Sequence, residues 1–153
     1  MKKIYFLALV MSLSFTSVFS QHLIKDINEG SGSSINSKYV QMNDIFFFKA
    51  NDGIHGEELW VTDGTEEGTI LIDIDTNGSA TSDPAKFTVI GDLMYFYAEN
   101  DTFYGEPWIS DGTAEGTYML KDINSNLDSS GGSSGASNFI PTNVKFNSLK
   151  IRI

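Results

Sequence analysis

Oxygen-bearing side chains at alternate positions form the clearest candidate metal site of this chain. Asp73, Asp75 and Asn77 precede Gly78, a pattern that opens calcium loops of the D-x-D-x-[DN]-G type. The match to an EF-hand fails at the bidentate glutamate position, where Pro84 stands. Turn-forming Asx residues after a strand produce the same pattern without a metal. Calcium is therefore the one candidate cofactor, and a simple turn is the alternative.

Catalytic residues are not predicted. Histidine occurs only at His22 and His55, and neither has a recognisable Ser or Cys nucleophile motif around it. The acidic pairs 57–58 and 66–67 could in principle supply the two carboxylates of a glycosidase. Adjacent residues on a strand point to opposite faces, however, and surface solvation explains these acids more simply. We therefore expect a protein that is not an enzyme.

One motif occurs twice. Residues 58–69 recur as residues 106–117 at an offset of 48 positions, and the similarity extends upstream of both copies. A period of roughly 20–50 residues marks a solenoid, propeller or array. A unique active site would not recur, so the repeated side chains are predicted to be structural. They are Glu58, Trp60, Asp63, Gly64, Thr65, Gly68, Thr69, Glu106, Trp108, Asp111, Gly112, Thr113, Gly116 and Thr117.

Each Asp-Gly-Thr segment is predicted to be a self-bonded loop. Asp63 and Asp111 can accept a hydrogen bond from the backbone N–H two residues further on, and the glycines supply positive φ. Flanking Thr hydroxyls can bond the remaining polar groups of the loop. Trp60 and Trp108 are expected to pack between units, with a sugar-stacking platform as the alternative.

The rest of the unit predicts strands. Apolar runs rich in aromatic and β-branched residues alternate with Asn, Asp and Gly turns. Four short antiparallel strands per 45–50 residues are typical of a β-propeller blade. The fold class is therefore all-β, with four-stranded propeller-like blades in an unclosed ring. The expected strands are 38–42, 45–50, 57–62 and 69–74 in one unit, and 86–90, 93–98, 106–110 and 117–123 in the next.

The repeat register also divides the chain. Glycine- and serine-rich stretches fall between units and are interpreted as connectors between blades. Two complete units are flanked by pieces of two others. The expected organisation is a signal peptide over 1–20, the end of a preceding blade with its connector over 21–37, a first blade over 38–74, a connector and second blade over 75–123, and a Gly/Ser-rich connector with a truncated third repeat over 124–153.

The repeated residues resemble a known family. Glu58-Leu59-Trp60-Val61-Thr62-Asp63-Gly64-Thr65, followed by Gly68-Thr69, is similar to the ELWxxDGT repeat of secreted bacterial proteins, which are also labelled hyalin-like. The segment 106–113 resembles its Glu-Pro-Trp variant. The resemblance implies a propeller-like tandem β architecture and a location outside the cell. It implies no reaction and no ligand.

The N-terminal sequence indicates where the protein is located, and the net charge limits which partners it can bind. Lys2 and Lys3 precede a mostly apolar stretch over 4–19, which is typical of a secretory signal cleaved after Ser20. The apolar run is shorter than the ~18–20 residues of a membrane-spanning helix. Without the two lysines, eight basic residues face 20 acidic ones, a net charge of −12. This balance argues against nucleic acid and anionic membranes as partners.

These observations predict a secreted, non-enzymatic interaction or adhesion module, released or held at the cell surface. Its expected partner is an extracellular protein or glycan, and open strand edges allow self-association. Two blades cannot close a ring of about four to eight. Two alternatives stay open: a propeller-type glycan hydrolase or lyase fragment, and a truncated gene product without autonomous activity.

Overall fold

The computed structural model describes residues 22–30, 32–34, 38–102 and 104–123, and the backbone of two short strands near the C-terminus. Within these residues the fold is all-β with antiparallel pairing, and no helix is present. The predicted signal peptide and most of the predicted third repeat lie outside the described residues.

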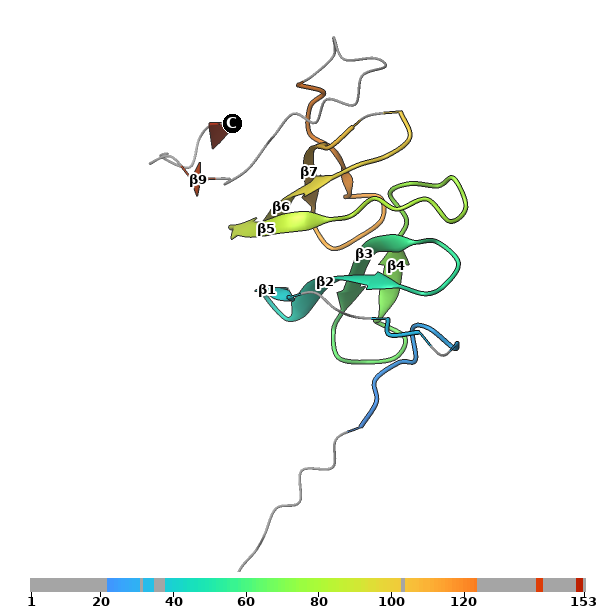
Figure 1. The fold of residues 1–153 in the computed structure, drawn as a ribbon. Coiled ribbons are helices and arrows are strands. Elements are labelled where there is room, and N and C mark those ends of the chain that lie inside the picture. The colour runs from blue at the N-terminus through green and yellow to red at the C-terminus, as the bar shows by residue number, and fades with distance from the viewer. Residues whose placement is uncertain are drawn as a thin grey trace, which may run out of the picture.

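Two four-stranded sheets make up the body of the structure (Figure 1). Each sheet is a meander in which strands that follow one another in sequence are hydrogen-bonded neighbours. Neither sheet closes into a barrel. The first sheet contains β1 (Val40–Met42), β2 (Ile45–Asn51), β3 (Glu57–Thr62) and β4 (Ile70–Ile72), and the second contains β5 (Ala85–Ile90), β6 (Leu93–Ala98), β7 (Glu106–Ser110) and β8 (Tyr118–Met119).

The strands lie where the apolar runs predict them. The first hairpin of each sheet turns at equivalent positions, with φ of +53° at Asn43 and +62° at Gly91. Asn and Gly tolerate this left-handed conformation, which tight hairpins require. The last strand of each sheet is shorter than expected, because the N–H groups of Ile74 and Ile123 bond glutamate side chains and not a neighbouring strand.

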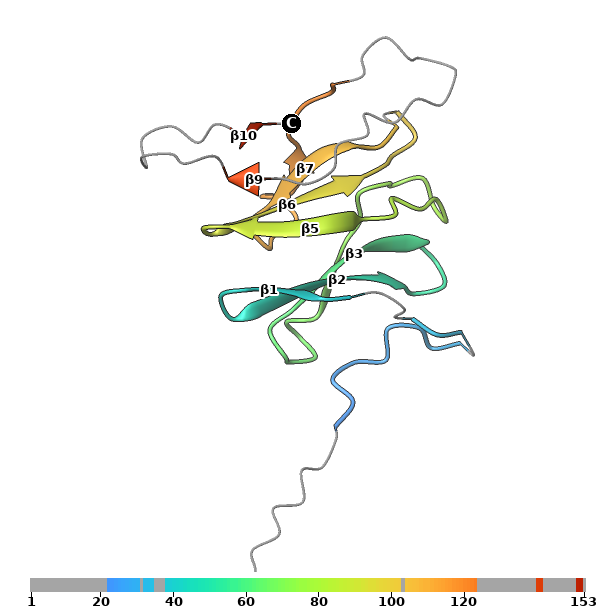
Figure 2. The ribbon, with the colours of Figure 1, turned by 60° about the vertical axis from the view of Figure 1, so that its left-hand side comes forward.

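The two sheets stack face to face (Figures 1 and 2). Alternation along β2 points Ile45 and Phe47 to the second sheet, and β6 directs Met94 and Phe96 back to the first. Burial of such a side chain contributes about 1.5–3 kcal/mol. The buried members of the shared core are Met42, Phe47, Leu59, Val61, Ile72, Ile74, Met94, Phe96, Ala98 and Trp108.

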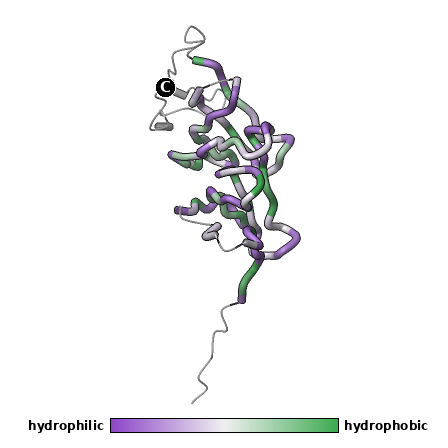
Figure 3. Tube along the Cα trace, turned by 45° about the vertical axis from the view of Figure 1, so that its right-hand side comes forward, coloured by the Kyte–Doolittle hydropathy of each residue, from purple (hydrophilic) through white to green (hydrophobic). Residues whose placement is uncertain are grey.

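Each sheet also has an apolar outer face. On the first sheet, Phe48, Ala50 and Trp60 form a second cluster with Ile27 from the N-terminal segment. On the second sheet, Tyr95 and Ile109 form a third. Figure 3 shows the start of the described N-terminal segment in the colour of apolar residues, where it approaches the first sheet. Both faces of these sheets therefore carry large apolar side chains.

A third, two-stranded sheet pairs β9 (Ile140–Pro141) with β10 (Ile151–Arg152). Both views place this pair on the side of the second sheet that faces away from the first (Figures 1 and 2). No helix among the described residues is long and apolar enough to cross a membrane.

Truncation of the shared core tests the stacking. Phe96→Ala removes a fully buried ring and is expected to lower the free energy of unfolding by about 3–5 kcal/mol. Ile54→Ala is the control, because 67 % of Ile54 is exposed in a turn, and it should change the value by less than about 1 kcal/mol. Urea unfolding of both variants measures the difference. Equal losses in the two variants would contradict the assignment of Phe96 to the core.

Candidate functional site

The Asp-Gly-Thr loop of the first sheet is closed by its own side chains. Asp63 Oδ1 accepts bonds from the backbone N–H of Thr65 at 2.9 Å and from its hydroxyl at 2.7 Å. The same Thr65 hydroxyl accepts the N–H of Gly68 at 2.9 Å, and Thr69 donates to the Thr65 carbonyl at 2.6 Å. Every predicted polar side chain of the loop is thus engaged within it.

The second loop repeats the same network 48 residues later. Asp111 Oδ1 accepts from the N–H and hydroxyl of Thr113 at 2.9 and 2.8 Å. The N–H of Gly116 donates to Thr113 Oγ1 at 2.9 Å, and Thr117 donates to the Thr113 carbonyl at 2.6 Å. Two copies of one sequence therefore reach one geometry, although they lie in different sheets.

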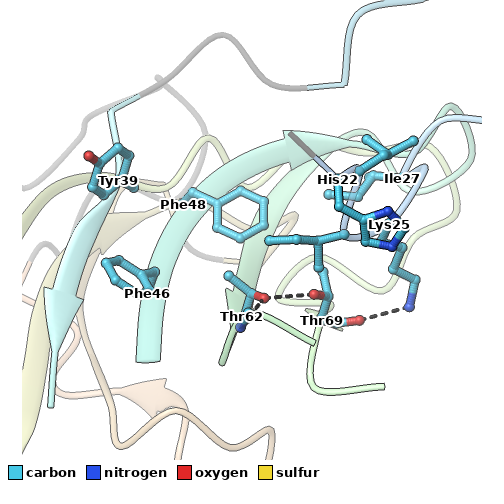
Figure 4. A pocket seen from close by; sticks show the side chains of 11 residues that line it. His22, Lys25, Ile27, Tyr39, Phe46, Phe48, Thr62 and Thr69 are labelled. Atoms are coloured by element: carbon cyan, nitrogen blue, oxygen red, sulfur yellow. Dashed lines mark hydrogen bonds between the residues drawn. The ribbon is translucent and has the colours of Figure 1, made fainter. Parts of the chain in front are cut away.

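Hydroxyl pairs tie each loop to the strands that carry it. Thr62 and Thr69 share a hydrogen bond of 2.7 Å between their hydroxyl oxygens (Figure 4). The second copy replaces Thr62 with Ser110, which bonds Thr117 at the same distance. The substitution keeps the hydroxyl and drops only a methyl group, so the bond survives it.

Glycine is required in these loops for two reasons. At Gly68 and at Gly116, an added Cβ would overlap the carboxylate of Asp63 or Asp111. Gly64 has φ of +91° and Gly112 has φ of +99°, a region that other residues rarely adopt. The loop therefore needs the glycines for close approach of the carboxylate as well as for backbone shape.

The loop aspartates behave as hydrogen-bond acceptors. Bonds from the hydroxyl and N–H of Thr65 hold the pKa of Asp63 below its usual value. Bonds from Thr113 do the same for the pKa of Asp111. A carboxylate that acts as a general acid needs a raised pKa, so neither loop has the electrostatics of an acid catalyst.

Glu58, the first residue of the repeated motif, is buried and hydrogen-bonded to the connector after β4. Its side chain is fully buried, and it accepts bonds from the N–H of Ile74 at 3.0 Å and the N–H of Ser82 at 2.9 Å. The Ser82 hydroxyl donates to it at 2.6 Å. Glu106 holds the equivalent N–H of Ile123 at 3.1 Å. The glutamate thereby fixes the chain that leaves β4 and enters the second sheet.

Burial raises the pKa of Glu58 to about 7, against the hydrogen bonds from Ser82 and Ile74 that favour the charged form. A raised pKa in a cleft is a feature of catalytic carboxylates. The oxygens of Glu58 point to backbone and to Ser82, however, and Glu57 beside it bonds Lys49 at 2.9 Å. The pair 57–58, one of the two glycosidase pairs considered from the sequence, is thus engaged in internal contacts.

Both tryptophans of the motif are buried. Trp60 is 6 % exposed and Trp108 is 8 % exposed. Trp108 belongs to the core shared by the two sheets, and its ring lies 6.4 Å from that of Phe96. A sugar-stacking platform needs an accessible ring face, which this placement does not offer.

The structure places the predicted calcium ligands in a turn. Asp75 is buried, and its Oδ1 accepts the N–H of Asn77 at 3.3 Å, while the Asn77 amide donates to Asp101. Partial burial raises the pKa of Asp73. Across the described residues, no group of three His, Cys, Asp or Glu side chains could hold a metal ion. The calcium site stays a prediction from the sequence.

Three contacts of the chain were not anticipated from the sequence. Lys49 bridges Glu57 at 2.9 Å and Asp83 at 2.6 Å. One repeat later, Tyr97 replaces the lysine and Gly105 replaces the glutamate. A Cβ on Gly105 would overlap the Tyr97 ring. The two positions change together between the repeats: an ion pair in the first becomes a ring over a glycine in the second. This paired difference is the sequence signal that could have revealed the contacts.

The histidines do not form a catalytic arrangement among the described residues. His55 Nδ1 lies 2.6 Å from Asp52 Oδ2 in the turn between β2 and β3, and this bond raises the pKa of His55. Asp52 also accepts the N–H groups of Ile54 and His55, both at 2.8 Å. These bonds are those of a closed turn. His22 lines a hollow on the first sheet.

Comparisons of the chain with protein-family models, curated proteins and solved structures find no match.

Titration of Glu58 predicts a pH-dependent stability. Its folded-state pKa of about 7 lies above the ordinary 4.5, so its contribution to stability is complete below about pH 4.5 and is lost as the pH rises through 7. The loss is on the order of 3 kcal/mol. Glu58→Gln should remove this slope between pH 5 and pH 8 in urea unfolding, whereas Glu67→Gln, at an exposed position, should retain it. An unchanged slope in Glu58→Gln would refute the assignment.

The overlap at Gly68 predicts a coupled pair. Gly68→Ala alone should cost about 1–3 kcal/mol, because its methyl group displaces the Asp63 carboxylate from its bonds. In an Asp63→Ala background the same change should cost markedly less. A double-mutant cycle of unfolding free energies measures the coupling. Additive losses would show that the close approach of Gly68 to Asp63 has no energetic weight.

Proposed function

We propose that this chain is a secreted, non-enzymatic repeat protein whose two sheets are successive blades of a propeller-like array. In this proposal it acts as an interaction or adhesion module outside the cell or at its surface, with an extracellular protein or glycan as its partner. The signal-like N-terminus and the resemblance to ELWxxDGT repeats support the location.

One observation carries the proposal: the most distinctive side chains of the chain are engaged in copies of the same internal network. Asp63 and Asp111 close loops, and Glu58 and Glu106 hold connectors. A catalytic group has to be free to contact a substrate. Because the repeated motif builds the scaffold, function falls to the exposed surface that the scaffold presents.

The arrangement of the sheets supports the propeller-like part of the proposal. Both sheets are four-stranded meanders that stack face to face, as neighbouring blades do. The face of the second sheet that packs on the first consists of the same repeat positions as the outer face of the first sheet. Stacking of this kind can continue from sheet to sheet.

A parallel screen tests the function. The secreted chain is applied to a glycan array and to a panel of extracellular proteins, and it is incubated with chromogenic glycoside and uronide substrates. We expect saturable binding to a partner and no turnover. Turnover that persists through purification and is lost in Glu57→Gln or Glu58→Gln would contradict the proposal, because these residues would then be catalytic.

Export is tested separately. The processed protein is expected outside the cell with Gln21 as its first residue, which N-terminal sequencing of the secreted product would show. Retention of residues 1–20 on an intracellular product would contradict the assigned location.

A further inference from the structure

The outer face of the first sheet, on the side away from the second sheet, is open. A hollow of about 460 Å³ lies over it, lined by Tyr39, Phe46 and Phe48 of the sheet and by Leu23 and Ile24 of the N-terminal segment. Figure 4 shows the three aromatic rings side by side at this surface. Tyr39 is 72 % exposed and Leu23 is 71 % exposed. Large apolar side chains exposed together mark a surface that binds a partner.

The chain itself shows what covers such a face. One repeat later, the positions of Tyr39, Phe46 and Phe48 are Phe87, Met94 and Phe96, which the first sheet covers in the shared core. Phe96 is fully buried there. The occupant of the equivalent face is therefore a second sheet of the same repeat, packed through its other face.

The equivalent glycines of the two loops differ in their contact with a neighbouring sheet. At Gly112, an added Cβ would overlap Ile45 Cδ1 of the neighbouring sheet. At the equivalent Gly64, which lines the hollow, no atom lies within 4 Å. The position beside the glycine that Ile45 occupies at the second loop is thus unoccupied at the first.

The N-terminal segment lies where the last strand and tail of a covering sheet would lie. Ile27 packs on Phe48 and Trp60, and its counterpart in the repeat is Ile74. Ile74 lies within the shared core together with the residues of the first sheet. Ile123 is the counterpart of both in the second sheet, and its N–H bonds Glu106 as that of Ile74 bonds Glu58. A second sheet that covers this face therefore brings its own Ile123 and replaces the segment that contains Ile27.

The required apolar surface is present on the opposite end of the chain. The outer face of the second sheet carries residues that match, position for position, those with which the first sheet covers its neighbour. Leu93 is the counterpart of Ile45, and Tyr95 is the counterpart of Phe47. The remaining residues of this outer face are Ile90, Ile109 and Leu120.

We propose that the open face of the first sheet binds a second copy of this chain through the outer face of that copy's second sheet, with Leu93 seated over Gly64. The contact is head-to-tail, so it can propagate or close into a ring. Tyr95 and Ile109 are buried within a single chain, and the β9–β10 pair lies on their side (Figure 2). The incoming copy takes the place of that pair. The proposal names a partner for the interaction module and in that respect rests on the proposed function.

Sedimentation velocity of the secreted full-length chain tests the interface. Two, three or four copies would supply the four to eight sheets of a closed ring, so we expect a discrete species in this range. Tyr39→Glu on one face and Leu93→Glu on the other should each give monomers. Ile54→Glu, which changes an apolar residue that is 67 % exposed in a turn, should assemble like the wild type. Thermal melts confirm that each variant is folded.

Mixing the two interface variants gives the sharpest result. Each retains one intact face, so an equimolar mixture should form a heterodimer and nothing larger. A wild-type chain that stays monomeric would overturn the proposal. So would a Leu93→Glu variant that still dimerises, since the contact would then join two copies of the open face. A monomeric chain that binds a glycan without turnover would remove this interface while leaving the proposed function intact.

Discussion

The structure depends on one constraint: each sheet carries large apolar side chains on both of its faces. In β2 the residues Phe47 and Phe48 point to opposite sides, and both are buried. A sheet of this kind cannot leave either face in water without losing the burial energy of several rings. Stacking against another sheet is the direct solution, and it explains why the two sheets share one core.

The repeated motif makes this stacking possible. Glu58 holds the connector that leads from one sheet to the next, and Gly112 receives Ile45 from the neighbouring sheet. The Asp63 and Asp111 loops are closed by identical bonds. A motif rich in acids, Thr and Trp thus serves packing and chain direction, although the same residue types also occur in catalytic and sugar-binding sites.

Most of the secondary structure could be predicted from the sequence, because it follows from local patterns. The runs in β2 and β6 and the turns at Asn43 and Gly91 were anticipated from apolar periodicity and turn chemistry. The Asx bonds of the loops were equally local. The bonds from Ile74 and Ser82 to Glu58 were not predictable, because they join positions 16 and 24 residues apart. The open face likewise becomes visible only once the sheets are paired.

Successive repeat sheets pack with opposite faces in contact, Ile45 and Phe47 of one sheet against Met94 and Phe96 of the next, and Ile45 reaches the Gly112 loop. This arrangement is tested most directly by a nuclear Overhauser measurement between the Ile45 δ1-methyl group and the Hα protons of Gly112, which belong to different sheets. This packing predicts a cross-peak between them in the folded chain. Its absence, with the strand-to-strand cross-peaks of each sheet present, would show that the sheets form but do not stack in this way.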